Sequence, residues 1–379
     1  MAKSYVNRKL RNGDAAEIER IVRDCAPFVV TPSNIKDGEE YDIELLRKES
    51  CNTGVELKAL LDNNIFTRII PLINGKQQGK PLDDSQRKAC AIMCFLIYAG
   101  IEANPVTALW ERPSRSSYTK EEEDFLFRIA DHLYPQVFSD LALGRIQFIT
   151  QEVLAQARNA VVNSLQTMEN IRSFNYSAVP EQSYKLIYMG LLKVWCINKI
   201  KKNKDQKLRL LLDWMYNQTV SCFEVIGYAL NLFADNRSGG IFKKINSDKY
   251  DTVISNAKNA AWDILQILML FMGHQNSDRK TIYFFVTRDN HLLNLPRRVL
   301  QIYNNSKELK LFIDSSYPQF KYEGFMKSMD RFGNRADNEN HKAIVFNSLN
   351  DHIFKLECQV RDILATKSKE IEKLHVKEC

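Results

Sequence analysis

The sequence predicts an α/β protein with a parallel sheet flanked by helices and a large all-helical insertion. The clearest evidence is Thr281–Val286 (TIYFFV), a continuous β-branched and aromatic run between polar residues, which is typical of a strand buried on both faces. A shorter apolar run, Leu57–Leu61, predicts a second strand near the start of the same domain. Residues 119–235 show apolar side chains at helical spacing and no convincing strand, which places the insertion at residues 113–250.

Length and composition indicate a folded, multi-part protein. At 379 residues the chain exceeds what one hydrophobic core usually holds, so two lobes or one heavily inserted domain are expected. The composition is 45% apolar and 26% charged, which argues against intrinsic disorder. The net charge of +7 is compatible with a polyanionic partner and does not by itself identify one.

The cysteines and the N-terminus favour a cytoplasmic protein with reduced thiols. None of the eight cysteines has CxxC or Cys/His metal-ligand spacing, and Cys90 and Cys94 lie one helical turn apart on an apolar face, as expected of core residues. The first twenty residues are charged and lack the apolar region of a signal peptide. No segment reaches the roughly 18 uninterrupted apolar residues needed to span a membrane.

Turn and capping residues divide the first part of the core into strands and helices. After the strand 57–61, helices are expected at 65–73 and, capped by Asp83 or Asp84, at 85–99. Asn104 and Pro105 fit the cap and first position of a further helix that follows the short strand 101–104. The predicted segments are an N-terminal extension (1–54), the first core part (55–112), the insertion (113–250), the second core part (251–315) and a loop with a C-terminal helix (316–379).

The second core part contains the opening strand and its neighbours. A helix is expected at 253–272 and another at 292–303, and residues 309–313 are a candidate for a further short strand. Residues 315–340 are interpreted as loop-rich. The remainder, from about residue 342, has a partial heptad that predicts one charged amphipathic helix, which docks back onto the body or forms a dimer contact.

Four acidic residues stand at the ends of strands or on helices beside them. Asp62 and Asp289 each end a predicted strand, and the carboxyl edge of a parallel sheet is where open α/β folds bind ligands. Glu111 lies on the helix that Pro105 begins, and Asp263 lies on the helix before the Thr281–Val286 strand. Glu102 competes with Glu111 as the second acid, and Glu111 is preferred because Asn104 and Pro105 fix its helix.

The helix that carries Asp263 has a polar stripe beside an apolar one. The polar stripe, at helical spacing, consists of Asn256, Asn259, Asp263 and Gln266. Because most of the rest of the helix is apolar, this stripe is expected to line a cleft. A solvent-facing stripe is the alternative.

Taken in order, these pieces resemble the PIN-like nuclease domain. They are Leu60–Asn64, Pro105–Glu111, Asn259–Asp263 and Val286–Asp289. The resemblance covers roughly residues 55–112 and 252–315, and it implies a Rossmann-like core whose acids hold one or two divalent ions. By resemblance, Asp62, Asp263 and Asp289 would ligate the metal, while Glu111 would ligate it directly or orient a water. The long stretch between Glu111 and Asp263 departs from a compact domain of this kind.

The chemistry of the acids agrees with what the resemblance implies. Hard Mg²⁺ or Mn²⁺ prefers carboxylate oxygens, and two ions about 3.5–4 Å apart can activate a water against a phosphodiester. Expected substrate contacts are Arg288, Asn64 and Asn259. Family analogy favours RNA over DNA as the substrate, and a nuclease of this kind can serve as a toxin or defence effector.

Other features leave alternatives open. The basic run between Lys193 and Arg209 fits a phosphate-binding patch or a solvated junction between helices. Arg297 and Arg298 are expected to flank the site with Arg288. The insertion or the C-terminal helix could also mediate homo-oligomer formation. The alternative function is a non-enzymatic interaction protein with a vestigial acidic site.

Overall fold

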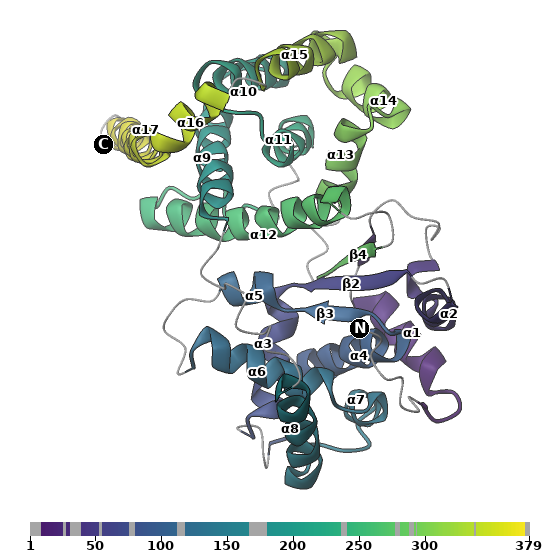
Figure 1. The fold of residues 1–379 in the computed structure, drawn as a ribbon. Helices are drawn as coiled ribbons and strands as arrows, with labels where there is room; N and C mark the ends of the chain where they lie inside the picture. Colours follow the sequence, from purple (N-terminus) through teal and green to yellow (C-terminus); the bar gives the residue numbers. More distant parts are fainter. Residues whose placement is uncertain are drawn as a thin grey trace. The chain divides into compact units, whose positions relative to one another are not determined.

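The chain forms two compact units in the computed structural model. The model describes residues 9–25, 28–30, 39–52, 55–75, 80–111, 118–166, 180–235, 241–276, 281–287, 292, 294–336 and 339–375. The sheet unit comprises Met1–Val179 and Met269–Asn290, and the helical unit comprises Pro180–Leu268 and His291–Cys379. Figure 1 labels the helices of both units and the strands β2, β3 and β4.

The sheet unit contains one four-stranded sheet in the order β1-β4-β2-β3. Its strands are β1 (Phe28–Val30), β2 (Glu56–Leu61), β3 (Glu102–Asn104) and β4 (Thr281–Val286). β2 runs parallel to both β3 and β4, with Leu61 opposite Val286, and β1 pairs antiparallel with the other edge of β4. The predicted α/β class and the parallel pairing of the core strands are therefore confirmed.

Strand β4 is buried on both faces at its carboxyl end, where Phe284, Phe285 and Val286 are all buried, while Thr281 and Tyr283 are half-buried. Ile282, Phe284 and Val286 point into the main core of the sheet unit and are 9%, 0% and 0% exposed. Phe285 points to the opposite face of the sheet and is also fully buried. Leu60 on the neighbouring strand β2 is 7% exposed. Strand β4 is thus buried on both faces, as predicted.

Helices pack around the sheet in this unit. They are α1 (Asp14–Cys25), α2 (Ile43–Asn52), α3 (Asn63–Ile73), α4 (Asp84–Ala99), α5 (Val106–Glu111), α6 (Lys120–Asp131), α7 (Pro135–Ala142) and α8 (Gln151–Gln166), with a 3-10 turn at Glu39–Tyr41. Side-chain caps begin α3, α4 and α6. Asp83 and Gln86 form a capping box at α4, and Gly100 ends this helix at a φ of 76°. Every residue from Ala89 to Ala99 is buried, including the two predicted core cysteines.

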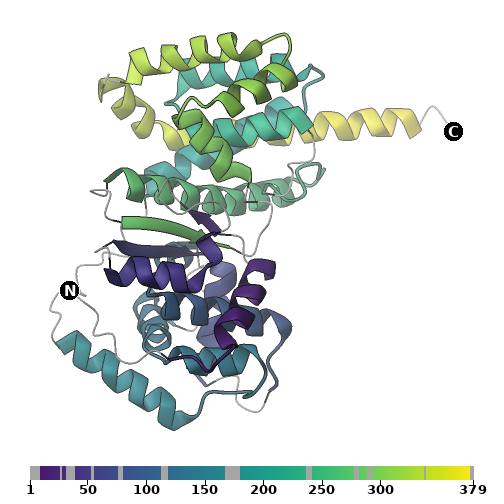
Figure 2. The ribbon, with the colours of Figure 1, turned by 90° about the vertical axis from the view of Figure 1, so that its right-hand side faces the viewer.

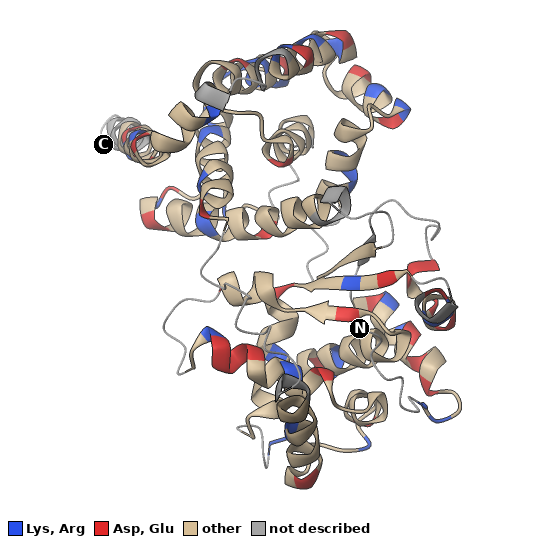
Figure 3. Cartoon of the chain, viewed as in Figure 1, with Lys and Arg blue, Asp and Glu red and all other residues tan. Residues whose placement is uncertain are grey.

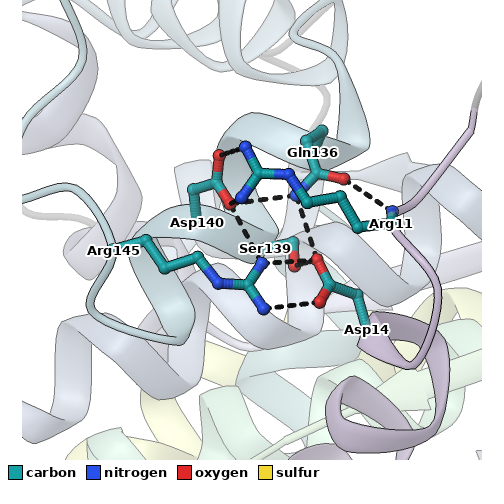
Figure 4. Close-up of polar contacts among 6 residues, drawn as sticks. All are labelled: Arg11, Asp14, Gln136, Ser139, Asp140 and Arg145. Atoms are coloured by element: carbon teal, nitrogen blue, oxygen red, sulfur yellow. Dashed lines mark hydrogen bonds and ion pairs between the residues drawn. The ribbon is translucent and has the colours of Figure 1, made fainter.

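A buried ion pair fastens α1 to the turn after α7. Asp14 is 3% exposed, and both of its carboxylate oxygens accept hydrogen bonds from Arg145, at 2.6 and 2.7 Å. Ser139 and Gln136 donate to the same carboxylate at 2.8 and 3.0 Å. Figure 4 shows Arg145 between Asp14 and Asp140, which also accepts from Arg11. The Arg145 guanidinium, acting against the desolvation of the carboxylate, holds the pKa of Asp14 well below its usual range.

The helical unit is built from helices on both sides of β4 in the sequence. They are α9 (Glu181–Asn198), α10 (Lys204–Gln218), α11 (Phe223–Asp235), α12 (Tyr250–Asn276), α13 (Asn294–Tyr303), α14 (Lys307–Ser316), α15 (Lys321–Ala336), α16 (Glu339–Asn347) and α17 (Leu349–His375). The boundary with the sheet unit falls inside α12, after Leu268. Buried polar groups cross-link the unit: Trp195 donates to the carbonyl of Ile245 at 2.9 Å, and Tyr317 to that of Leu230 at 2.6 Å.

The C-terminal helix docks onto the helical unit. Leu356, Val360 and Leu364 of α17 are buried, and Glu357 accepts a hydrogen bond of 2.7 Å from Tyr188 on α9. Figure 2 shows α17 as one long yellow helix. The expected docking of the tail is thereby confirmed, while a dimer contact stays a prediction.

Two expectations for the second half were wrong. The candidate strand 309–313 is part of α14, and most of the loop-rich stretch 315–340 forms α15. In α14, Leu309 and Ile313 are buried one helical turn apart, whereas Leu311 is 71% exposed. The side chain of Ser306 caps the backbone N–H of Leu309 and starts this helix. The apolar spacing of residues 309–313 is compatible with a strand and with a helix. The Ser306 cap favours the helix.

The units do not follow the predicted segment boundaries. Helices α6 to α8 fall in the predicted insertion, yet they belong to the sheet unit, where Phe66 of α3 stacks on Phe127 of α6 with ring centroids 5.6 Å apart. The stretch from α13 to α17 belongs to the helical unit. Among the described residues, no helix is both long and apolar enough to cross a bilayer.

We predict that Asp14→Asn destabilises the protein by about 1–2 kcal/mol at neutral pH, because charge-assisted hydrogen bonds to Arg145 are lost. Since the folded-state pKa of Asp14 is depressed, its contribution is complete above the unfolded-state pKa of about 4 and disappears as the pH falls through the folded value. Urea unfolding at pH 7 and pH 3 should show the difference between wild type and variant shrinking on acidification.

The matched control is Glu17→Gln on the same helix. Glu17 pairs with Arg20 at 2.6 Å, but both side chains are largely exposed, so this substitution should leave the unfolding midpoint unchanged. Equal effects of the two substitutions would contradict the role assigned to the buried pair.

Candidate functional site

Asp62 occupies the turn between β2 and α3 at the carboxyl edge of the sheet. Its backbone is extended, and it serves as the N-cap of α3. One carboxylate oxygen, Oδ1, accepts from the backbone N–H of Asn64 at 3.2 Å, and the other, Oδ2, accepts from the side-chain amide of Asn64 at 3.0 Å. The side chain is only 2% exposed. Asp62 and Asn64, both predicted site residues, therefore contact each other.

Thr287 connects this carboxylate to the end of β4. It follows the strand directly, is fully buried, and donates from Oγ1 to Oδ2 of Asp62 at 2.6 Å. The backbone N–H of Asp62 donates to the carbonyl of Val286 at 3.1 Å, which extends the parallel pairing by one residue. The ends of β2 and β4 are thus tied by a side-chain and a backbone bond. The sequence motif Val286–Asp289 includes Thr287, but a site role was predicted only for Arg288 and Asp289, although a hydroxyl residue directly after a buried strand is itself a signal.

Helix α5 begins beside the same edge. The Oδ1 atom of Asn104 caps the N–H of Val106 at 2.9 Å, as predicted, and Thr107 donates to the carbonyl of Leu61 at 3.2 Å. Glu111 is half-buried at the end of this helix. The hydroxyl of Thr107 anchors the first turn of α5 to the last residue of β2.

The sheet register separates the two candidates for the second acid. Glu102 is exposed and lies opposite Lys58, three residues before the end of β2. It thus stands about 10 Å along the strand from the level of Leu61. Glu111 is on a helix that starts at the carboxyl edge, so the register favours Glu111 over Glu102.

Two more polar atoms near this edge are buried without a hydrogen-bond partner. They are Oδ1 of Asn63, next to Asp62, and Nε1 of Trp110, next to Glu111. Buried polar atoms are rarely left unpaired, so each points to an interaction with a group beyond the described residues. The Asn63 oxygen is of the kind that a hard cation prefers, and the Asp62 carboxylate keeps at least one free lone-pair direction. Both fit a divalent ion at this edge.

The remaining predicted site residues lie either in the helical unit or outside the described residues. Asp263 and Asn259 lie on the part of α12 that belongs to the helical unit, where Asp263 is half-buried and Asn259 exposed. Arg288 and Asp289 lie outside the described residues. Within the described ranges, no group of three or more His, Cys, Asp or Glu side chains is arranged to hold a metal ion. The four-acid site therefore stays a prediction.

The polar stripe of α12 is not uniform in exposure. Gln266 is 2% exposed, whereas Asn259 is exposed and Asn256 donates back to its own helix, to the carbonyl of Thr252 at 2.7 Å. Next to Asp263, Trp262 packs against Tyr184 with ring centroids 4.4 Å apart. The stripe therefore runs from solvent at Asn259 into the interior at Gln266.

Arg298, one of the basic side chains predicted to flank the site, packs and hydrogen-bonds within the helical unit. Arg298 lies over Phe312, with its guanidinium carbon 3.4 Å from the ring centroid, and donates to Asn231 and Gln301. Burial lowers the pKa of Arg298 to about 10. Arg298 is thus held by packing and hydrogen bonds within the helical unit, and its expected place beside the acidic site stays a prediction.

The basic run is largely held against its own unit. Lys193 lies over Trp214, and Lys207 donates to the carbonyl of Asn198 at 2.9 Å. Figure 3 shows basic and acidic residues alternating along α15. The structure therefore favours the junction interpretation for these two lysines.

Searches against family models, curated proteins and solved structures found no match for this chain.

We predict that Thr287→Val destabilises the sheet unit by about 1.5–3 kcal/mol, because the bond to the buried Asp62 carboxylate is lost while the shape is kept. Urea unfolding should show a lower midpoint. Thr287→Ser retains the hydroxyl and should lower the stability of the protein clearly less than Thr287→Val does. If Val and Ser at this position are equally stable, the hydroxyl does not hold Asp62.

Proposed function

We propose that the chain is a metal-dependent nuclease with a PIN-like core that hydrolyses phosphodiester bonds, with RNA favoured over DNA. The proposal rests on one observation: the buried Asp62 at the end of β2 is hydrogen-bonded to Thr287 at the end of the adjacent parallel strand. Asp289 follows Thr287 by two residues, and consecutive Cα atoms are about 3.8 Å apart, so covalent geometry keeps it within about 8 Å of the Thr287 Cα. We therefore propose that Asp289 acts together with Asp62.

In this proposal Asp62, Asp263 and Asp289 bind Mg²⁺ or Mn²⁺, and Glu111 binds it directly or orients a water. A divalent ion held there would lower the pKa of a bound water and offset charge on the phosphate. The chain's own residues prepare the site: Thr287 and Asn64 fix the orientation of the Asp62 carboxylate. Fixed hydrogen bonds of this kind keep a ligand carboxylate in one rotamer before the cation arrives.

Substrate binding is assigned to Arg288, Asn64 and Asn259. Arg288 directly precedes Asp289, so its guanidinium would meet the phosphate that the acids act on. The preference for RNA rests on the family resemblance.

A second function is favoured by the same geometry. Asp62 accepts three hydrogen bonds from within the protein and caps α3, which a purely structural aspartate would also do. In that case the chain would be a non-enzymatic interaction protein that retains the acid for folding. Cleavage activity distinguishes the two functions.

The test is incubation of the purified protein with labelled single- and double-stranded RNA and DNA, with Mn²⁺ or Mg²⁺ and with a chelator. We expect cleavage that needs the ion. Asp289→Asn should reduce the rate more than about 100-fold, because even outer-shell partners of metal sites contribute about 10–100-fold. Circular dichroism should show that the variant is folded.

Three further variants sharpen this test. Glu111→Gln should reduce cleavage strongly and Glu102→Gln should not, as the register of β3 requires. Asp84→Asn, which changes an exposed aspartate paired with Lys88, controls for the loss of a negative charge. An Asp289→Asn protein that cleaves as fast as wild type would disprove the metal-site mechanism.

A further inference from the structure

The helical unit contains a cavity of about 660 Å³ walled by aromatic and methionine side chains. Its aromatic wall consists of Phe223 at the start of α11, Tyr303 at the end of α13, and Phe325 and Phe332 on α15. The rings of Phe223 and Tyr303 meet edge to face with centroids 4.9 Å apart. Such a wall favours a planar ligand that can pack against rings.

The cavity is open on the side of Gly333. Gly333 lies within α15, where glycine costs about 1 kcal/mol relative to alanine. A Cβ atom added to it would meet no other atom within 4 Å, so close packing does not explain the glycine. The space in front of Gly333 is therefore available to a ligand.

Behind the aromatic wall is a buried carboxyl group. Glu224 is 2% exposed, its Oε2 atom accepts from Sγ of Cys222 at 3.4 Å, and its Oε1 atom is buried without a hydrogen-bond partner. Burial raises the pKa of Glu224, and hydrogen bonds from Cys222 and Tyr303 oppose that rise only in part. The interaction between Glu224 and Tyr303 places a second acidic group next to the aromatic wall.

The charge of the cavity selects against anions. Asp330 is the one charged side chain among the described residues that line it, and they include no lysine or arginine. A phosphate or carboxylate ligand would therefore meet repulsion without a compensating cation. A positive charge would be attracted both by Asp330 and by the faces of the aromatic rings.

We propose that this cavity is a binding site for a small planar aromatic cation. The ring system lies between the aromatic side chains and the space before Gly333, and its positive charge faces Asp330. This site is formed by α11, α13, α15 and the turns that contain Ser221 and Asn305, all within the helical unit, and it does not rest on the nuclease proposal.

The test is a fluorescence titration of the purified, nucleic-acid-free full chain with proflavine, a planar aromatic cation with two amino groups. We expect saturable binding at one site. Anilinonaphthalene sulfonate, an aromatic anion, should bind at least about tenfold more weakly. Non-saturable proflavine binding, or tighter binding of the anion, would overturn the proposal.

Substitutions at Gly333 locate the site. Gly333→Trp places an indole in the open space and should weaken proflavine binding more than tenfold, while Gly333→Ala leaves room and should bind as wild type. Asp330→Asn should weaken binding about threefold to fivefold, as expected of a partly exposed charge pair. Thermal unfolding should show that all three proteins are folded. Unchanged binding by the folded Gly333→Trp protein would place proflavine elsewhere and contradict the assignment.

Discussion

The parallel pairing of β2 with β4 is the constraint on which the sheet unit depends. Residues 225 positions apart, Asp62 and Thr287, meet because these strands are neighbours in the sheet. Parallel strands need a long crossover, and here the crossover contains helices α3 to α8 and then α9 to α12, the first half of the helical unit. The same pairing buries Phe284 and Val286 in the core. Without it, the edge that carries Asp62 would have no counterpart from the second half of the chain.

Where sequence signals were local and chemically specific, they predicted the structure well. The apolar run of β4, the capping box at Asp83 and the Asn104–Pro105 helix start all have a physical cause within a few residues. The position of Asp62 at a strand end followed from the same kind of evidence. Local signals were thus sufficient to place the elements of the sheet and the first acid on its edge.

The features that the sequence did not predict depend on tertiary contacts. The bond from Thr287 to Asp62 needs the strand order, and the packing of Arg298 on Phe312 needs two helices to meet. The cavity at Gly333 joins three helices from separate parts of the chain, so no window of sequence contains it. The strand prediction for residues 309–313 was wrong for a different reason. The apolar spacing of this stretch fits a strand and a helix equally, and only the Ser306 cap distinguishes them.

The interrupted sheet also has a consequence for synthesis on the ribosome. Strand β4 begins 177 positions after β3 ends, so at about 5–20 residues per second it emerges roughly 10–35 s later. During that interval one edge of β2 has no strand to pair with, and an open apolar edge is a template for aggregation. The nascent sheet unit is therefore a natural client for chaperones, and slow elongation through the helical segment would prolong that exposure.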